Sequence, residues 1–179
     1  MKSTLPLVAL ATLCVVSFGA SAAPSAVVDN AALPEPVRVP AGHKPLLSAT
    51  GVGELTYECR EKKDAAGVFE WAFVGPVAKL YSSDKKEIGK YYAGPTWESV
   101  DGSKVTGKQV AVAPATPGSI PLQLVKAEPA TGTGAMTGVS YIQRLNTKGG
   151  VAPATACTSD TKGARQQVAY EAEYVFYGS

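Results

Sequence analysis

Histidine is almost missing from this chain, which has a single one, His43, among 179 residues. Transition-metal sites draw on several histidine or cysteine ligands, and a Ser-His-Asp hydrolase would have to use His43 itself. The G-x-S-x-G sequence that carries the nucleophile of many hydrolases is missing as well. The sequence therefore predicts no metal site and disfavours a serine hydrolase.

A nucleotide-binding loop is lacking too, although Gly132, Gly134 and Gly138 have a superficially similar spacing. A dinucleotide-binding loop leads from a strand into a helix, whereas the segment 139–145 has the pattern of a strand. We therefore expect a glycine-rich loop between strands and no cofactor.

Neither an excess of one charge nor a long apolar run is present. The chain has 17 basic and 15 acidic side chains, which gives no electrostatic reason to expect nucleic acid as a partner. The apolar run Leu5–Phe18 is shorter than the roughly 20 residues that span a bilayer, so no membrane span is expected.

That short apolar run has the features of a secretory signal peptide. Lys2 precedes the run, and Ala20-Ser21-Ala22 after it is a cleavage site of the A-x-A kind. The sequence predicts that residues 1–22 are removed after Ala22 and that the protein is secreted or periplasmic.

Cysteine is scarce, with three in the chain. Cys14 lies in the signal peptide, which leaves Cys59 and Cys157 in the mature protein. An even pair in an oxidising compartment favours one structural disulfide. The alternative is two free thiols, one of them reactive.

Alternation of apolar and polar residues with a period of two dominates the mature chain, and no segment has a convincing helical stripe. We expect a flexible Ala/Pro-rich arm over residues 23–36 and a single all-β domain over 37–179. The predicted strands are 54–59, 68–74, 77–81, 87–92, 104–112, 120–127, 137–146 and 167–176. Gly, Pro, Asn and Asp between them favour an antiparallel β-sandwich or barrel with little helix.

One segment, Tyr91–Ser103, concentrates aromatic, hydroxyl and carboxylate groups, and we interpret it as a loop. Such a surface binds sugars or other polar rings. The candidate ligand-binding residues are Tyr91, Tyr92, Trp97, Glu98 and Asp101.

Two other interpretations of this segment stay open. Glu98 and Asp101 have the chemistry of an acid/base pair, which makes them candidate catalytic residues of a metal-independent hydrolase or lyase. Alternatively, Trp97 fills the end of the barrel while Asp101 and Ser103 cap their own turn.

The order and spacing of several motifs between Pro40 and Tyr177 resemble the secreted bacterial and fungal proteins of domain-of-unknown-function family 3455. The segments that carry the resemblance are Leu55-Thr56-Tyr57-Glu58-Cys59, Trp71-Ala72-Phe73, Pro76–Tyr81, Tyr92–Glu98, Asp101-Gly102-Ser103, Tyr141–Arg144, Thr147–Gly150 and Pro153…Cys157. Members of that family typically have a histidine where this chain has Tyr91 and a tryptophan where it has Leu122. The resemblance implies export, a β-rich domain and a cysteine pair at matching positions, and it brings no established activity.

Taken with the missing catalytic motifs, these features favour a binding or interaction module over an enzyme. Its expected partner is a small molecule, a glycan or an envelope protein. A structural envelope or surface protein would have the same sequence features.

Overall fold

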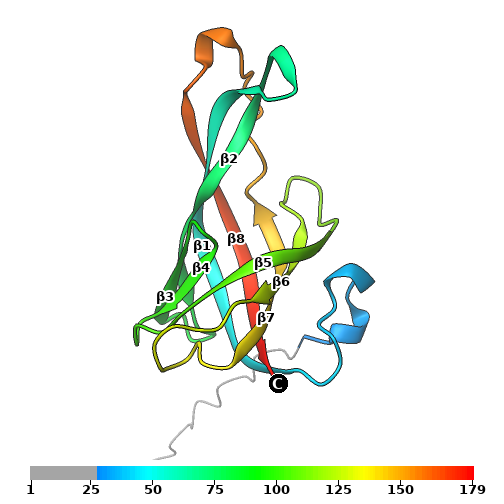
Figure 1. Cartoon of the computed structure of the whole chain (residues 1–179), viewed down its shortest axis with the longest axis vertical. Coiled ribbons are helices and arrows are strands. Elements are labelled where there is room, and N and C mark those ends of the chain that lie inside the picture. The colour runs from blue at the N-terminus through cyan, green and yellow to red at the C-terminus, as the bar shows by residue number, and fades with distance from the viewer. Residues whose placement is uncertain (1–27) are drawn as a thin grey trace, which may run out of the picture.

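Eight antiparallel strands form a closed barrel in the computed structural model of the chain, which describes residues 28–179 (Figure 1). Each strand is hydrogen-bonded to the next, and the last pairs with the first. The all-β, antiparallel prediction is confirmed, and the barrel is the correct alternative. The strands are β1 Lys44–Lys62, β2 Ala65–Tyr81, β3 Glu87–Tyr92, β4 Thr96–Ser99, β5 Lys104–Ala113, β6 Leu122–Ala127, β7 Val139–Gly149 and β8 Arg165–Gly178. The predicted signal peptide lies outside the described residues.

β1 begins at Lys44, ten residues before the predicted segment 54–59, and two further strands differ from the expectation. The segments 68–74 and 77–81 are one strand, β2, although Gly75 and Pro76 separate them in the sequence. Proline has no N–H to donate to a neighbouring strand. Pro76 is tolerated here because the ladder between β2 and β3 begins only at Val77, so no β3 residue pairs with Pro76. The other strand is β4, which forms a hairpin with β3 inside the segment that we interpreted as a loop.

Because the strands alternate in direction, the connections gather at the two ends of the barrel. At the end of the barrel that faces upward in Figure 1 lies the loop 114–121, and the loop 150–164 and the β1–β2 hairpin rise above it. The lower end carries the turns 82–86, 100–103 and 128–138. The hairpin extends beyond the barrel wall as an arm, residues 59–71.

A disulfide ties this arm to the loop 150–164. Cys59 and Cys157 are bonded, with their Cα atoms 5.4 Å apart, which confirms the disulfide prediction. The Trp71 Nε1–H donates to the Thr155 carbonyl at 2.7 Å, on the same side of the hairpin. The loop therefore covers one face of the arm.

The barrel interior is filled by side chains, most of them apolar or aromatic. Trp97, Tyr174, Phe176 and Ile142 are among the largest that are fully buried. Gly51 makes room for one of them, since a Cβ at that position would lie 2.6 Å from Cε2 of Tyr174. The interior is thus a packed core, with a pocket near its upper end.

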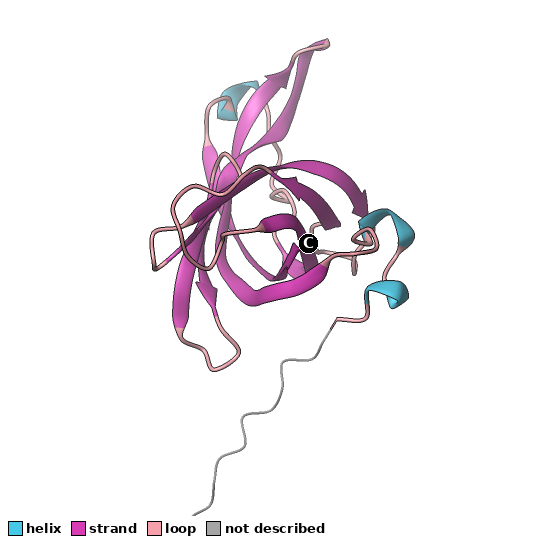
Figure 2. Ribbon diagram, turned by 60° about the horizontal axis from the view of Figure 1, so that its bottom comes forward, coloured by secondary structure: helices cyan, strands magenta, loops and turns pink. Residues whose placement is uncertain are grey.

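The described part of the expected Ala/Pro-rich arm, residues 28–36, packs beside the barrel. It contains two 3-10 turns, Asn30–Ala32 and Glu35–Val37, which Figure 2 shows beside the outer wall. Val37 is buried in a second apolar cluster against β5 to β8. Residues 28–179 contain no helix with the length and apolar character needed to cross a membrane.

Candidate functional site

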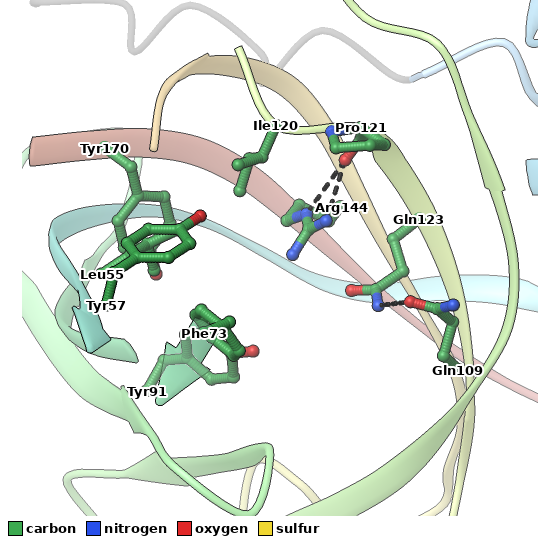
Figure 3. Close-up of a pocket in the computed structure, with 10 residues that line it drawn as sticks. All are labelled: Leu55, Tyr57, Phe73, Tyr91, Gln109, Ile120, Pro121, Gln123, Arg144 and Tyr170. Atoms are coloured by element: carbon green, nitrogen blue, oxygen red, sulfur yellow. Dashed lines mark hydrogen bonds between the residues drawn. The ribbon is translucent and has the colours of Figure 1, made fainter. Parts of the chain in front are cut away.

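A pocket of about 220 Å³ lies at the upper end of the barrel (Figure 3). Seven of the eight strands, all except β4, and the loop before β6 contribute to its wall. The lining residues are Leu55, Tyr57, Phe73, Tyr91, Gln109, Ile120, Pro121, Gln123, Arg144 and Tyr170. Figure 3 shows the aromatic side chains on one side and Arg144 with the two glutamines on the other.

Three buried tyrosines form the inner part of the aromatic side. The Tyr57 hydroxyl donates to the Gly150 carbonyl at 2.7 Å, and the Tyr170 hydroxyl lies 3.3 Å from that of Tyr174. Burial raises the pKa of Tyr57, Tyr91 and Tyr170, while the positive charge of Arg144 opposes the rise. The phenols are therefore neutral at ordinary pH, and Arg144 is close enough to act on all three.

A β-bulge brings Phe73 to the same pocket. Thr56 pairs with Gly75, but Tyr57 pairs with Phe73, so Val74 is the extra residue. Because of this extra residue, Phe73 shares the inward face with Tyr57, and their rings meet edge to face at 5.7 Å. The Phe73 side chain is still 54% exposed, so the upper edge of the pocket presents an open aromatic surface.

Arg144 is the one cation among the lining residues. Strand register places it between Gln123 of β6 and Tyr174 of β8, on the inward face of β7. Its Nε and Nη2 groups both donate to the Pro121 carbonyl, at 3.2 and 2.9 Å. Within residues 28–179 it forms no ion pair with a carboxylate. Its charge is thus held in place without being neutralised.

The loop that holds Arg144 is itself fixed by β7. The Ile120 N–H donates to the Gly149 carbonyl at 2.9 Å, and the Thr147 hydroxyl donates to the Ile120 carbonyl at 2.6 Å. Gly150, with φ of +79°, packs beneath this loop, where a Cβ would lie 3.0 Å from side-chain atoms of Leu55 and Tyr170. The pocket wall on this side is therefore preformed.

Two glutamines complete the polar side of the pocket. The Gln123 Nε2 group donates to Gln109 Oε1 at 2.7 Å, across the β5–β6 ladder. Each amide keeps further hydrogen-bonding groups beyond this contact. They lie at the opening, where both side chains are partly or fully exposed.

The five sequence-predicted site residues fall into three separate places. Tyr91 and Trp97 pair across the β3–β4 hairpin and point into the barrel, where their rings stack at 4.7 Å. Tyr91 lines the pocket, whereas Trp97 lies deeper and is 1% exposed. In this conformation Trp97 offers no surface on which a ligand ring can stack.

Tyr92 and Glu98 lie on the outer face of the same hairpin. The Tyr92 hydroxyl donates to Glu98 Oε2 at 2.7 Å, and this bond is the main cause that lowers the pKa of Glu98. Lys90 and Lys104 form ion pairs with the same carboxylate, at 3.3 and 3.2 Å. A groove of about 200 Å³ runs beside Glu98, but the carboxylate is already engaged on both oxygens.

Asp101 lies in the turn between β4 and β5, at the lower end of the barrel. Its Oδ1 accepts from the Ser103 N–H at 2.9 Å and the Ser103 hydroxyl at 2.6 Å, and its Oδ2 accepts from the Ala135 N–H at 2.8 Å. These bonds, the Ser103 hydroxyl foremost, lower the pKa of Asp101 to about 2. Asp101 thus ties two lower turns together, and Met136 is packed into the core beside it.

Sequence reasoning found Tyr91 but missed the rest of the pocket, Arg144 above all. In β7 apolar and polar residues do not alternate clearly, because both faces of the strand are covered. Gln143 and Leu145, on the outer face, are buried by the N-terminal segment. The sequence did contain one signal: Arg144 lies two residues after the apolar Ile142, so both side chains point to the same, inward face of β7.

Comparison with known proteins adds one match. A family model described as a protein of unknown function (DUF3455) matches residues 40–178, a range that contains all eight strands, and this confirms the resemblance found in the sequence. No curated protein and no solved structure matches the chain.

Proposed function

Because this chain belongs to the DUF3455 family, whose function is unknown, we propose from the geometry of its own barrel that it is a binding protein. Its ligand is a small organic molecule that enters the pocket at the upper end. The observation that carries the proposal is the open pocket itself, which combines four aromatic rings with one guanidinium that has no carboxylate partner among residues 28–179. Ligand sites are typically concave, largely apolar and equipped with a few convergent polar groups.

The residues around the pocket support binding more than catalysis. Among the ten described residues that line it, none is a carboxylate, histidine, cysteine, serine or lysine. The tyrosine phenols have raised pKa values, which makes them poor general bases. The hydrolase or lyase alternative would have to use Glu98 and Asp101, whose oxygens are engaged in ion pairs or hydrogen bonds at separate places.

We further propose that the protein acts outside the cytoplasm, secreted or in the periplasm, after cleavage behind Ala22. The disulfide between Cys59 and Cys157 is compatible with such a location, since disulfides persist in oxidising compartments. The signal-peptide pattern of residues 1–22 supports the same location.

The binding proposal is tested by NMR titration of the ¹⁵N-labelled protein with small ring compounds of neutral, anionic and cationic kinds. We expect amide shifts to change around the pocket, on β1, β3, β7 and β8. The variant Gln109→Trp places a large side chain at the opening and should abolish these changes. Lys108→Trp, the neighbouring outward position, is the matched control and should leave them intact.

Two outcomes would contradict the proposal. One is that no compound in the set shifts the pocket amides of the wild-type protein at millimolar concentration. The other is that Gln109→Trp binds the same compounds as tightly as Lys108→Trp.

A further inference from the structure

We infer that the ligand of this pocket is a small ring compound that bears one carboxylate, and that Arg144 pairs with that carboxylate. This inference rests on the proposed binding function and names the class of molecule that the pocket takes. Two features of the same pocket carry it: the Arg144 guanidinium has one free edge, and an aromatic wall lies on the opposite side.

The guanidinium of Arg144 has five N–H donors: two edges of the planar group present a pair of donors each, and the fifth donor points away from both edges. Nε and Nη2 lie on one edge, and both donate to the Pro121 carbonyl. The other edge, made by Nη1 and the second N–H of Nη2, has no hydrogen-bond partner within residues 28–179. A planar carboxylate is the group that this edge binds with two parallel hydrogen bonds.

The charge around the pocket favours a single negative charge on the ligand. Arg144 is the one ionised group among the ten lining residues; it is half-buried and has no carboxylate partner within residues 28–179. One carboxylate neutralises it. A phosphate monoester would bring a second negative charge among neutral phenols, and the Tyr57 hydroxyl is already bonded to the Gly150 carbonyl.

The aromatic wall defines the rest of the ligand. Tyr57, Tyr91 and Tyr170 form the inner surface, and Phe73 leaves about half of its side chain exposed at the edge. A flat ring held between these side chains and Arg144 would cover the exposed part of Phe73, which removes apolar surface from water. The cavity of about 220 Å³ has room for a small molecule of this kind.

The test compares benzoate with benzamide, which has the same ring and nearly the same shape but no charge, and with phenyl phosphate. Each is titrated by NMR into the wild-type protein and into Arg144→Gln, which keeps a donor for the Pro121 carbonyl. In the wild type we expect benzoate to bind at least tenfold more tightly than either comparator. In Arg144→Gln the benzoate affinity should fall at least tenfold while the benzamide affinity stays within twofold.

Two further variants keep the result clear. Arg38→Gln removes the same charge from the exposed N-terminal segment and should leave benzoate binding unchanged. Arg144→Lys retains the charge without the planar fork, so it should keep a preference for benzoate over benzamide at reduced affinity. If Arg144→Gln does not fold, the carboxylate assignment is decided by the wild-type preference for benzoate over benzamide and by the same comparison in Arg144→Lys.

Failure of this inference differs from failure of the binding proposal. If benzamide or phenyl phosphate binds the pocket as tightly as benzoate, or if Arg144→Gln keeps the benzoate affinity, the carboxylate assignment is wrong while the pocket remains a binding site. If none of the three compounds shifts the pocket amides and the wider set of ring compounds also fails, the binding function itself is wrong.

Discussion

The indole ring of Trp97 stacks on the phenol ring of Tyr91 inside the barrel, with the ring centroids 4.7 Å apart and the planes 21° from parallel. Trp97 also meets the rings of Tyr174 and Phe176 edge to face, at 5.7 and 6.3 Å. This one side chain thus joins the short strand β4 to β3 and β8. It supports the pocket from below, because Tyr91 forms part of the pocket wall.

Removing the indole should therefore destabilise the protein. Trp97→Ala is expected to lower the free energy of unfolding by about 3 to 5 kcal/mol, the usual cost of deleting a buried aromatic side chain. Trp97→Phe should cost much less, since it keeps a ring and removes Nε1, a buried donor with no partner among the described residues. Urea denaturation measures both changes.

Val100→Ala is the control for Trp97→Ala, because Val100 is 74% exposed and should change stability by less than about 0.5 kcal/mol. A Trp97→Ala variant as stable as Val100→Ala would contradict the packing role of the indole.

The disulfide should stabilise the fold and hold the arm. Replacing both Cys59 and Cys157 by alanine is expected to lower the free energy of unfolding by about 2 to 5 kcal/mol, since the bond closes a long loop in the unfolded chain. Denaturation of the double variant beside the wild type measures the loss. Peptide mapping without reductant should recover the linked pair, and two thiols that alkylate freely in the native protein would refute the bond.

Asp101 should make the protein sensitive to acid. Its hydrogen bonds lower its pKa from 3.8 to about 2 in the folded state, so the ionised carboxylate stabilises the fold above about pH 4. This contribution is lost as the pH falls through 2. Unfolding free energies measured between pH 5 and pH 2 should therefore decline less steeply for Asp101→Asn than for the wild type.

Ser103→Ala removes the donor that contributes most to the low pKa of Asp101, so it should also flatten the acid dependence, though by less. If the free energy of unfolding falls with pH at the same slope in the wild type and in both variants, Asp101 makes no such contribution.

Gln143 should hold the N-terminal segment against the barrel. It is fully buried, its Nε2 donates to the Val37 carbonyl at 2.6 Å, and its Oε1 accepts from the Tyr177 hydroxyl at 2.8 Å. Gln143→Leu leaves both partners unsatisfied, which should cost about 1 to 3 kcal/mol for each buried group. Hydrogen exchange should become faster over residues 30–39.

The matched control is Gln167→Leu, the same substitution at an exposed position of β8. If exchange over residues 30–39 is equally slow in Gln143→Leu and Gln167→Leu, the amide does not anchor the segment.

Export should leave a defined N-terminus. The Ala20-Ser21-Ala22 site predicts a mature chain that begins at Ala23. Mass spectrometry of the protein recovered from the periplasm or the medium measures this directly. Recovery from the cytoplasm alone, with Met1 or Lys2 still at the N-terminus, would reject the export prediction.

The sequence by itself determined where most strands lie and that Cys59 pairs with Cys157. In β8, Tyr170, Ala172 and Tyr174 alternate with partly exposed or exposed residues, and a side chain on every second position reaches the same face of any sheet. The cysteine pair required only an even count and an oxidising compartment. Both inferences depend on local chemistry, so a single chain was enough for them.

Only the tertiary structure decided which side chains meet. The segment around Tyr91 and Trp97 looked like one functional surface because its groups are adjacent in sequence, yet neighbours on a strand point to opposite faces. The pocket instead joins Phe73, placed by a bulge, with Arg144, placed by the register between β7 and β8. Register depends on turn geometry and on how the buried faces of neighbouring strands match, and closure depends on contacts across the whole barrel, so neither follows from one strand alone.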